Sequence, residues 1–182
     1  SRDGGRHWEG KPEVEKLREE HSWYLPYSPE AGCIRGFAAH GERVYAAVEQ
    51  GGVLRSDDAG GTWHLVQGST GEPDNHPVAP FIQNDVHSVH VHPTSADLVF
   101  APTAGGLFRS RDGGRSWERL YRCYARAAWV DPEDPEHIVF APADGVSENG
   151  RIEVTRDGGQ SWQDASAGTK APWPDHMVER FA

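Results

Sequence analysis

One octapeptide occurs four times in the 182-residue chain, and this repetition constrains the fold more than any other feature. The copies begin at Ser1, Ser56, Ser110 and Thr155, so successive starts are 55, 54 and 45 residues apart. All four follow the pattern Ser/Thr-x-Asp-x-Gly-x-Ser/Thr/His-Trp. Such spacing predicts one supersecondary unit per repeat. The patterned positions are Asp3, Gly5, Trp8, Asp58, Gly60, Trp63, Asp112, Gly114, Trp117, Asp157, Gly159 and Trp162.

The octapeptide has the chemistry of a hairpin turn. Glycine adopts positive φ without steric cost. An aspartate at a turn accepts hydrogen bonds from backbone N–H groups just ahead of it, and a hydroxyl can join the same network. The closing tryptophan offers a large apolar surface for packing between neighbouring sheets. We therefore interpret the four aspartates as structural rather than catalytic.

Strand-like segments surround each octapeptide. They are short, rich in β-branched or aromatic residues and separated by Gly, Pro and Asp turns. The predicted strands are 34–39, 43–48 and 52–56; 86–91, 98–101 and 106–110; 125–130, 137–141 and 151–155; and a short fourth strand after each octapeptide, such as 117–120. The octapeptide then lies on the hairpin between the third and fourth strands of each unit.

This pattern resembles the Asp box, or BNR repeat, of sialidase-like and sortilin-like β-propellers. The resemblance implies an all-β fold of four-stranded antiparallel blades. Complete blades are expected at about 33–66, 86–120 and 124–165, with a blade end at 1–10 and the start of another at 177–182. We read this as about three and a half blades of a six- or seven-bladed ring. The remaining blades would come from the same full-length chain or from a second copy; a compact arrangement that forms no ring is the alternative.

Composition narrows the possible partners. With 28 acidic residues against 18 Lys and Arg, the formal net charge is −10, which argues against a general nucleic-acid binder. The sequence has no apolar run long enough to predict membrane insertion. No segment of these residues resembles a signal peptide, and the cellular compartment is not assigned. Cys33 and Cys123 predict neither a disulfide nor a zinc site, and we expect no cofactor.

The first strands of the blades share a basic position. Aligned in register, they place Arg35, His87, Arg126 and Arg180 at corresponding sites near the strand entrance. Residues two and four places later, such as Phe37 and Ala39, are apolar and are expected to be buried. We predict a partial ring of cations at the channel mouth, suited to an anionic ligand. The alternative is that each arginine pairs with an acidic neighbour and sets the spacing of the blades.

Long connections between blades offer a second candidate surface. They cover 9–32, 67–85 and 165–176, on the rim opposite the octapeptide turns. Long loops on a rigid scaffold commonly carry binding residues. The candidates here are the aromatic residues Trp23, Tyr24 and Trp173, which suit a glycan or a peptide but could equally cap the rim. Histidines 87, 90 and 92 also suggest a metal site, although His92 occupies a repeated turn position, so we assign no metal.

The sequence predicts the function of the chain less directly than its fold, because one fold can host many functions. The overall pattern resembles bacterial proteins of the WD40/YVTN/BNR-like group, and related propellers include photosystem II assembly factors and sorting receptors. Sialidases use an arginine triad, which Arg35, Arg126 and Arg180 could imitate, but the Arg-Ile-Pro motif of that family is absent and no nucleophilic Tyr can be assigned. We therefore favour a non-catalytic propeller that binds a glycan or protein ligand. The alternative is a glycoside hydrolase whose catalytic residues lie partly outside this segment.

Overall fold

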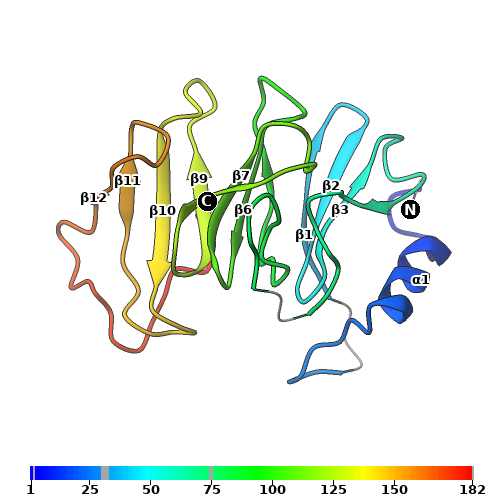
Figure 1. Cartoon of the computed structure of the whole chain (residues 1–182), viewed down its shortest axis with the longest axis horizontal. Coiled ribbons are helices and arrows are strands. Elements are labelled where there is room, and N and C mark those ends of the chain that lie inside the picture. Colours follow the sequence, from blue (N-terminus) through cyan, green and yellow to red (C-terminus); the bar gives the residue numbers. More distant parts are fainter. Residues whose placement is uncertain (2, 30–32, 74–75, 182) are drawn as a thin grey trace.

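Three four-stranded antiparallel sheets make up most of the chain. A computed structural model describes residues 1, 3–29, 33–73 and 76–181. The sheets follow one another along the long axis of the molecule (Figure 1). The strands are β1 (Ile34–His40), β2 (Arg43–Val48), β3 (Gly52–Ser56) and β4 (His64–Leu65); β5 (His90–Val91), β6 (Val99–Thr103), β7 (Gly106–Ser110) and β8 (Glu118–Tyr121); and β9 (Tyr124–Val130), β10 (Ile138–Ala143), β11 (Glu153–Thr155) and β12 (Gln163–Asp164).

Each sheet is a meander in which consecutive strands pair, as the repeat predicts. The all-β blade architecture expected from the sequence is confirmed. One strand is shorter than expected: the second blade begins its regular pairing at His90, not at residue 86, although Val86 still bridges Thr103. Pro102 of β6 faces the unpaired stretch, and a proline has no N–H to continue the ladder.

The core lies between the blades rather than inside any one of them. One apolar cluster joins the first blade, through Tyr45 and Val53, to the second, through Val99 and Phe108. A second cluster joins the second blade to the third and is centred on Phe140. The middle strands of the second blade are therefore buried on both faces, because the first and third blades cover them.

The octapeptide tryptophans point toward the blade that precedes them in the sequence. Trp117 of the second blade is buried against the first, and Trp162 of the third packs against the second. Trp63 of the first blade has no preceding blade and packs instead on the N-terminal segment. Packing between sheets is thus as predicted for Trp117 and Trp162. Trp8 is the exception: it is 80% exposed, because no blade of the described structure packs against it, and the described residues among 1–10 form no strand.

The burial expected for Phe37 is wrong for the same reason. Phe37 is 63% exposed, and Ala39 is exposed too, whereas the equivalent Val89 and Ala128 are buried. Phe37 lies on the face of the first blade that Trp63 shares, with the two rings 5.9 Å apart. That face looks away from the second blade, and the N-terminal segment packs on part of it.

The octapeptide turns have the predicted hydrogen bonds. In the second blade, Asp112 Oδ1 accepts from the Ser116 backbone N–H (2.9 Å) and from Ser110 Oγ (2.8 Å). The same contacts recur around Asp58 and Asp157. Gly114 has φ +90°, and a Cβ there would lie 2.9 Å from Val66 of the preceding blade. Glycine is therefore required both by the turn and by the close approach of two blades.

A helix that the sequence analysis did not predict covers the outer face of the first blade. Helix α1 (Pro12–Glu20) begins with a proline in its first turn, where the missing N–H costs nothing. Val14 and Leu17 pack against the cluster formed by Trp23, Leu25 and the first blade. Charged residues dominate the rest of the helix, so only this narrow apolar stripe marked it in the sequence. Figure 1 shows α1 at one end of the row of sheets.

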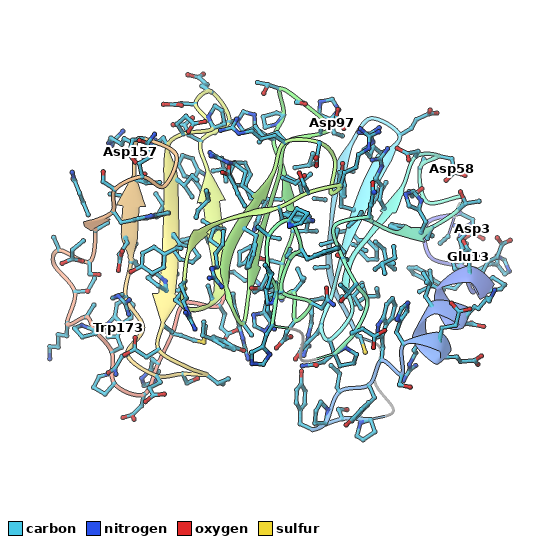
Figure 2. All side chains as sticks on the ribbon, viewed as in Figure 1. Asp3, Glu13, Asp58, Asp97, Asp157 and Trp173 are labelled. Atoms are coloured by element: carbon cyan, nitrogen blue, oxygen red, sulfur yellow. The ribbon has the colours of Figure 1, made fainter. Side chains whose placement is uncertain are left out.

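The two rims of the molecule carry different elements. Figure 2 shows Asp58 and Asp157 at one edge of the sheets and Trp173 at the opposite edge. The octapeptide turns and the long connections therefore lie on opposite rims, as expected. Residues 177–181, expected to start a further blade, show no strand pairing. Within the described residues, no helix has the length and apolar character needed to cross a bilayer.

Because the core lies between the blades, Phe140 and Phe37 are expected to contribute very different amounts to the free energy of unfolding. Phe140 is fully buried between the second and third blades, and Phe37 is mostly exposed. We expect Phe140→Ala to lower the free energy of unfolding by about 3–5 kcal/mol. Phe37→Ala should lower it by about 1 kcal/mol or less, the value of its contact with Trp63. Urea denaturation followed by tryptophan fluorescence measures both, and equal losses would contradict this placement of the core.

The octapeptide turns also predict a dependence of stability on acid. Hydrogen bonds from the Ser161 hydroxyl and backbone and from Thr155 lower the pKa of Asp157 to about 2. A carboxyl whose pKa is lower in the folded state stabilises the fold above its ordinary pKa near 3.8, and that stabilisation is lost as the pH falls toward 2. Asp157→Asn should therefore flatten the decline of melting temperature between pH 4 and pH 2. The exposed Asp175, changed to Asn, is the control and should leave the decline unchanged.

Candidate functional site

The four aligned basic residues line one pocket. Arg35, His87, Arg126 and Arg180 all border an open cavity of about 480 Å³, together with residues of β1, β5 and β9 and the C-terminal segment. β1, β5 and β9 are the first strands of their blades. A volume of this size lies within the range of small-ligand sites. The structure therefore brings together side chains that are separated by up to 145 residues in the sequence.

Arg35 is held by a buried acidic partner. Its guanidinium pairs with Glu49 at the end of β2, and the Glu49 side chain is only 8% exposed. Tyr27 completes the group: its hydroxyl donates to Glu49 Oε1 (2.6 Å), and the Arg35 guanidinium lies over its ring, 5.8 Å from the centroid. For Arg35, the alternative of pairing with an acidic neighbour is thus what the structure shows.

Arg126 has a similar environment in the third blade. Its Nη1 donates to both carboxylate oxygens of Glu179 (2.9 Å), and its Nε donates to the Tyr124 hydroxyl (3.2 Å). Burial disfavours the charged guanidinium, but the hydrogen bonds to Glu179 and Tyr124 outweigh it and raise the pKa of Arg126. Burial likewise raises the pKa of Tyr124, which stays protonated as a hydrogen-bond donor. The Glu179 contact also anchors the C-terminal segment against β9.

His87 stands between the other two basic positions and is almost fully buried. Its Nδ1 lies 2.8 Å from the carbonyl oxygen of Ala125, so Nδ1 carries a proton and donates it to that oxygen. Its Nε2 faces Asp85 Oδ1 at 3.4 Å and the Tyr124 hydroxyl at 3.3 Å. His90, the next histidine along the wall, has its pKa lowered by burial and contributes no charge at neutral pH.

Arg180 differs from the other arginines of the pocket. Its side chain is exposed, and it makes no hydrogen bond or ion pair with any of the described residues. The pocket lining contains three arginines and two glutamates, so its formal net charge is +1 when the histidines are counted as neutral. The lining is thus formally positive, whereas the whole chain has a net charge of −10. Among the described residues, Arg180 is therefore the one arginine of the lining that pairs with no acidic side chain.

The predicted aromatic residues do not belong to this pocket. Trp23 is buried in the cluster beside α1, where its Nε1 donates to the Gly71 carbonyl (2.7 Å). Trp173 pairs its backbone with Gly150 and so fastens the last connection to the third blade. Tyr24 is half exposed and lies outside the pocket lining. For Trp23 and Trp173, capping of the rim is the role that the contacts support.

Several residues of the site were missed in the sequence. Glu49 contacts Arg35, Glu179 contacts Arg126, and Tyr124 contacts both Arg126 and His87. Tyr124 could have been found, because it lies two residues before Arg126 and so shares its strand face. Glu49 and Glu179 carry no such signal, since their contacts depend on how the hairpin and the C-terminal segment fold back.

Neither cysteine has the environment of a nucleophile. Cys33 and Cys123 are both free thiols, as expected from their spacing. Burial raises the pKa of both, that of Cys123 to about 12, so the reactive thiolate is suppressed. The histidines considered as a metal group are also not assembled into one: Nδ1 of His92 contacts Thr94 and its Nε2 contacts the Asp131 carbonyl.

Solved structures show that this architecture is that of β-propeller proteins. An ancestral GH74 enzyme superposes with a TM-score of 0.61 at 21% identity, over 80% of this chain and 20% of its own. YCF48 bound to a D1 peptide gives 0.53 at 16%, over 82% and 48%. A structure of the nidogen/laminin complex gives 0.55 at 13%, over 78% and 51%. This chain thus spans a fifth to a half of these neighbours, and the likeness shows the fold alone. No protein-family model and no curated protein matches the sequence.

The unequal roles of the arginines can be tested through stability. Arg35→Ala leaves the buried Glu49 carboxylate with Tyr27 as its one remaining side-chain partner among the described residues, so we expect a loss of about 1–3 kcal/mol in the free energy of unfolding. Arg180→Ala removes an exposed side chain and should change it by about 0.5 kcal/mol or less. Urea denaturation of both variants measures the difference. Equal effects would show that Arg35 and Arg180 are held in the same way.

Proposed function

We propose that the chain is part of a non-catalytic β-propeller that binds an anionic ligand at the pocket lined by Arg35, His87, Arg126 and Arg180. The observation that carries this proposal is the convergence of basic side chains from three successive blades and the C-terminal segment on one cavity. Guanidinium groups bind carboxylates in a bidentate geometry that few other side chains offer. A carboxylate of an acidic peptide or an acidic sugar fits this chemistry.

The existing ion pairs are compatible with that role. Glu179 occupies Arg126 through both carboxylate oxygens, which is the contact that a ligand carboxylate would make. Glu179 lies on the C-terminal segment, outside any strand, and is half exposed. A ligand could therefore displace it without disturbing a blade. Arg180 supplies a second cation beside the same position.

A protein ligand has one further argument in its favour. Two of the propellers that share the fold were solved with a peptide or protein partner: YCF48 with a D1 peptide, and nidogen with laminin. The proposal extends to this chain only the idea that such a scaffold can present a binding surface. We also infer that the octapeptide turns are Asp boxes, on the strength of their repeated Ser/Thr–Asp–Gly hydrogen bonds.

A glycoside hydrolase is the second candidate, and the GH74 neighbours are the observation that favours it. Glycoside hydrolysis requires two carboxyl groups on opposite sides of the scissile bond, one of which donates a proton. The two carboxylates that line this pocket, Glu49 and Glu179, are both engaged by arginines. Neither is free to serve as an acid here, so the binding role has the stronger support.

Calorimetry with an acidic probe tests the proposal. We expect the chain to bind a short Glu-rich peptide or glucuronate, and Arg180→Ala to weaken that binding about 10- to 100-fold, the value of one charge-assisted hydrogen bond. Arg122→Ala is the matched control, because Arg122 is exposed beside the third blade but outside the pocket lining. Binding that is absent, or that falls equally in both variants, would contradict the proposal.

A second arm of the same experiment separates the two functions. Incubation of the chain with an aryl glycoside or a xyloglucan oligosaccharide, followed by chromatography, should show no cleavage if the chain only binds. Because the chain covers only 20% of the ancestral GH74 enzyme, the longest available form of the protein should be used for this arm. Cleavage that Glu49→Gln or Glu179→Gln abolishes would favour the hydrolase.

A further inference from the structure

Two potential metal ligands face each other beside the pocket. His87 Nδ1 donates to the Ala125 carbonyl (2.8 Å), and its Nε2 lies 3.4 Å from Asp85 Oδ1 and 3.3 Å from the Tyr124 hydroxyl. Asp85 Oδ1 is a buried oxygen that accepts no hydrogen bond in the described structure. Burying a carboxylate oxygen without a partner is unfavourable, and a cation bound between it and His87 Nε2 would offset that cost.

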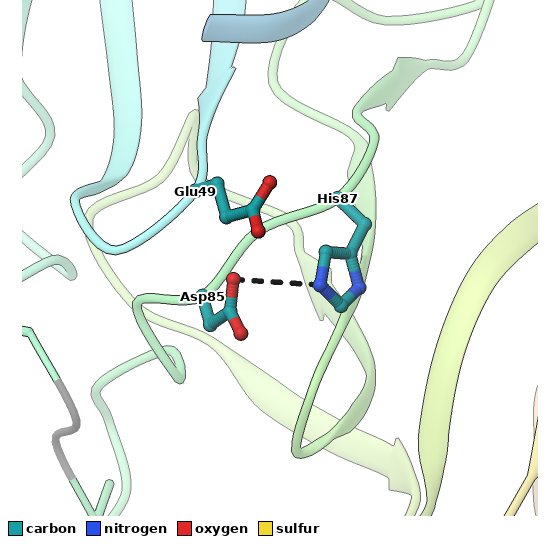
Figure 3. A group of neighbouring side chains, drawn as sticks. All are labelled: Glu49, Asp85 and His87. Carbon is teal, nitrogen blue, oxygen red and sulfur yellow. Dashed lines mark ion pairs between the residues drawn. The ribbon is translucent and has the colours of Figure 1, made fainter. Parts of the chain in front are cut away.

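A third ligand atom completes the group. Glu49 of the first blade brings a carboxylate oxygen to the same place, and the ligand atoms of Glu49, Asp85 and His87 all lie within 4.8 Å of one another. Figure 3 shows Asp85 and His87 facing each other, with the Glu49 carboxylate beside them. Within the part of the chain that the structure describes, this is the one group of three such residues.

The geometry suits a small divalent ion. Oxygen and nitrogen ligands lie about 2.0–2.2 Å from Zn²⁺, so two ligands on adjacent corners of a tetrahedron are about 3.4 Å apart. The Asp85–His87 separation already has this value. The Glu49 oxygen lies within 4.8 Å of the other two ligand atoms and would move closer to them to occupy the third corner. The fourth corner would face the pocket, which Glu49 and His87 line.

The backbone holds the three residues in place. Around Glu49, the Gly52 N–H donates to the Asn84 carbonyl (2.7 Å), which ties the hairpin of the first blade to the entrance of the second. The carbonyl of Asp85 accepts from the Ala104 N–H (3.0 Å), and the His87 N–H donates to the Pro102 carbonyl (3.0 Å). A site built on such restrained backbone requires little rearrangement when an ion binds.

Groups outside the three ligands also fit a metal centre. Histidine ligands of metals commonly donate their other ring N–H to a carbonyl, as His87 does to Ala125. Ligating carboxylates are themselves hydrogen-bonded, as Glu49 is by Tyr27 and Arg35. Arg35 neutralises only one of the two carboxylates, so the three-residue group keeps a negative charge that a divalent cation would offset.

We propose that Glu49, Asp85 and His87 form a binding site for a divalent transition metal of the Zn²⁺ class. The two carboxylates and one imidazole match the mixed O/N ligand sets that bind Zn²⁺. The site lies between two blades, with Glu49 from the first and the other two ligands from the second. A bound ion would therefore also tie these blades together. The inference does not depend on the proposed anion binding.

Metal titration of the full 182-residue chain, without an affinity tag, tests this site. After treatment with a chelator and buffer exchange, Zn²⁺ is titrated by calorimetry with no anionic ligand present, and Co²⁺ is added separately to record its ligand-field absorption. We expect one equivalent of Zn²⁺ to bind and the melting temperature to rise with Zn²⁺ concentration. Co²⁺ should give the spectrum of a four-coordinate site. Failure of anion binding would leave these results unchanged.

Size-matched variants locate the ion. Asp85→Asn and His87→Gln should each weaken Zn²⁺ binding more than about 100-fold, beyond the usual effect of losing a partner of a ligand. Asp131→Asn is the control, because Asp131 pairs with His137 at 2.9 Å but no third ligand joins them among the described residues. Circular dichroism establishes that each variant is folded, and two ligand variants guard against the failure of one. The proposal is overturned if the wild-type chain binds no stoichiometric Zn²⁺, or if the ligand variants bind as the control does.

Discussion

Apolar packing between adjacent sheets is the interaction on which the rest of this structure depends. Each blade is apolar on both faces, so it is stable only where a neighbour covers it. Trp117 and Phe140 occupy the two interfaces between blades, and both are buried. Where a neighbour is lacking, the same sequence pattern gives exposed residues, as at Trp8 and Phe37. Helix α1 is the local solution at one end, since it covers part of a face that no blade covers.

This packing also creates the pocket. Because the blades stack in register, their first strands lie side by side, and a residue near the entrance of each strand reaches the same space. Ser88 of the second blade donates to the Arg126 carbonyl of the third (2.9 Å), a direct measure of how closely two first strands approach. The basic side chains meet because the repeat puts them at equivalent positions, and not because any one blade contains a site.

The fold could be predicted from the sequence because the octapeptide and its flanking strands form a local pattern that repeats. The spacing of the octapeptides predicts the number of blades, and the turn chemistry predicts which hairpin they occupy. Only some residues of the candidate site could be predicted from the sequence. The basic residues share a strand position and were found, whereas Glu49 and Glu179 reach the pocket from a hairpin and from the C-terminal segment, whose paths no periodicity describes. Helix α1 was missed because its apolar stripe is short and its remaining residues are mostly charged. The metal ligands were missed because they come from two different blades.

Separate blades build one pocket from their first strands, and backbone NMR with an acidic peptide or glucuronate as probe can show whether a ligand binds there. The measurement maps which amide signals move on titration. We expect signals from residues 34–37, 87–90, 126–128 and 179–181 to shift together in one saturating transition, since all of these residues line the pocket. Shifts confined to the octapeptide turns on the opposite rim, or spread over the surface without saturation, would contradict it.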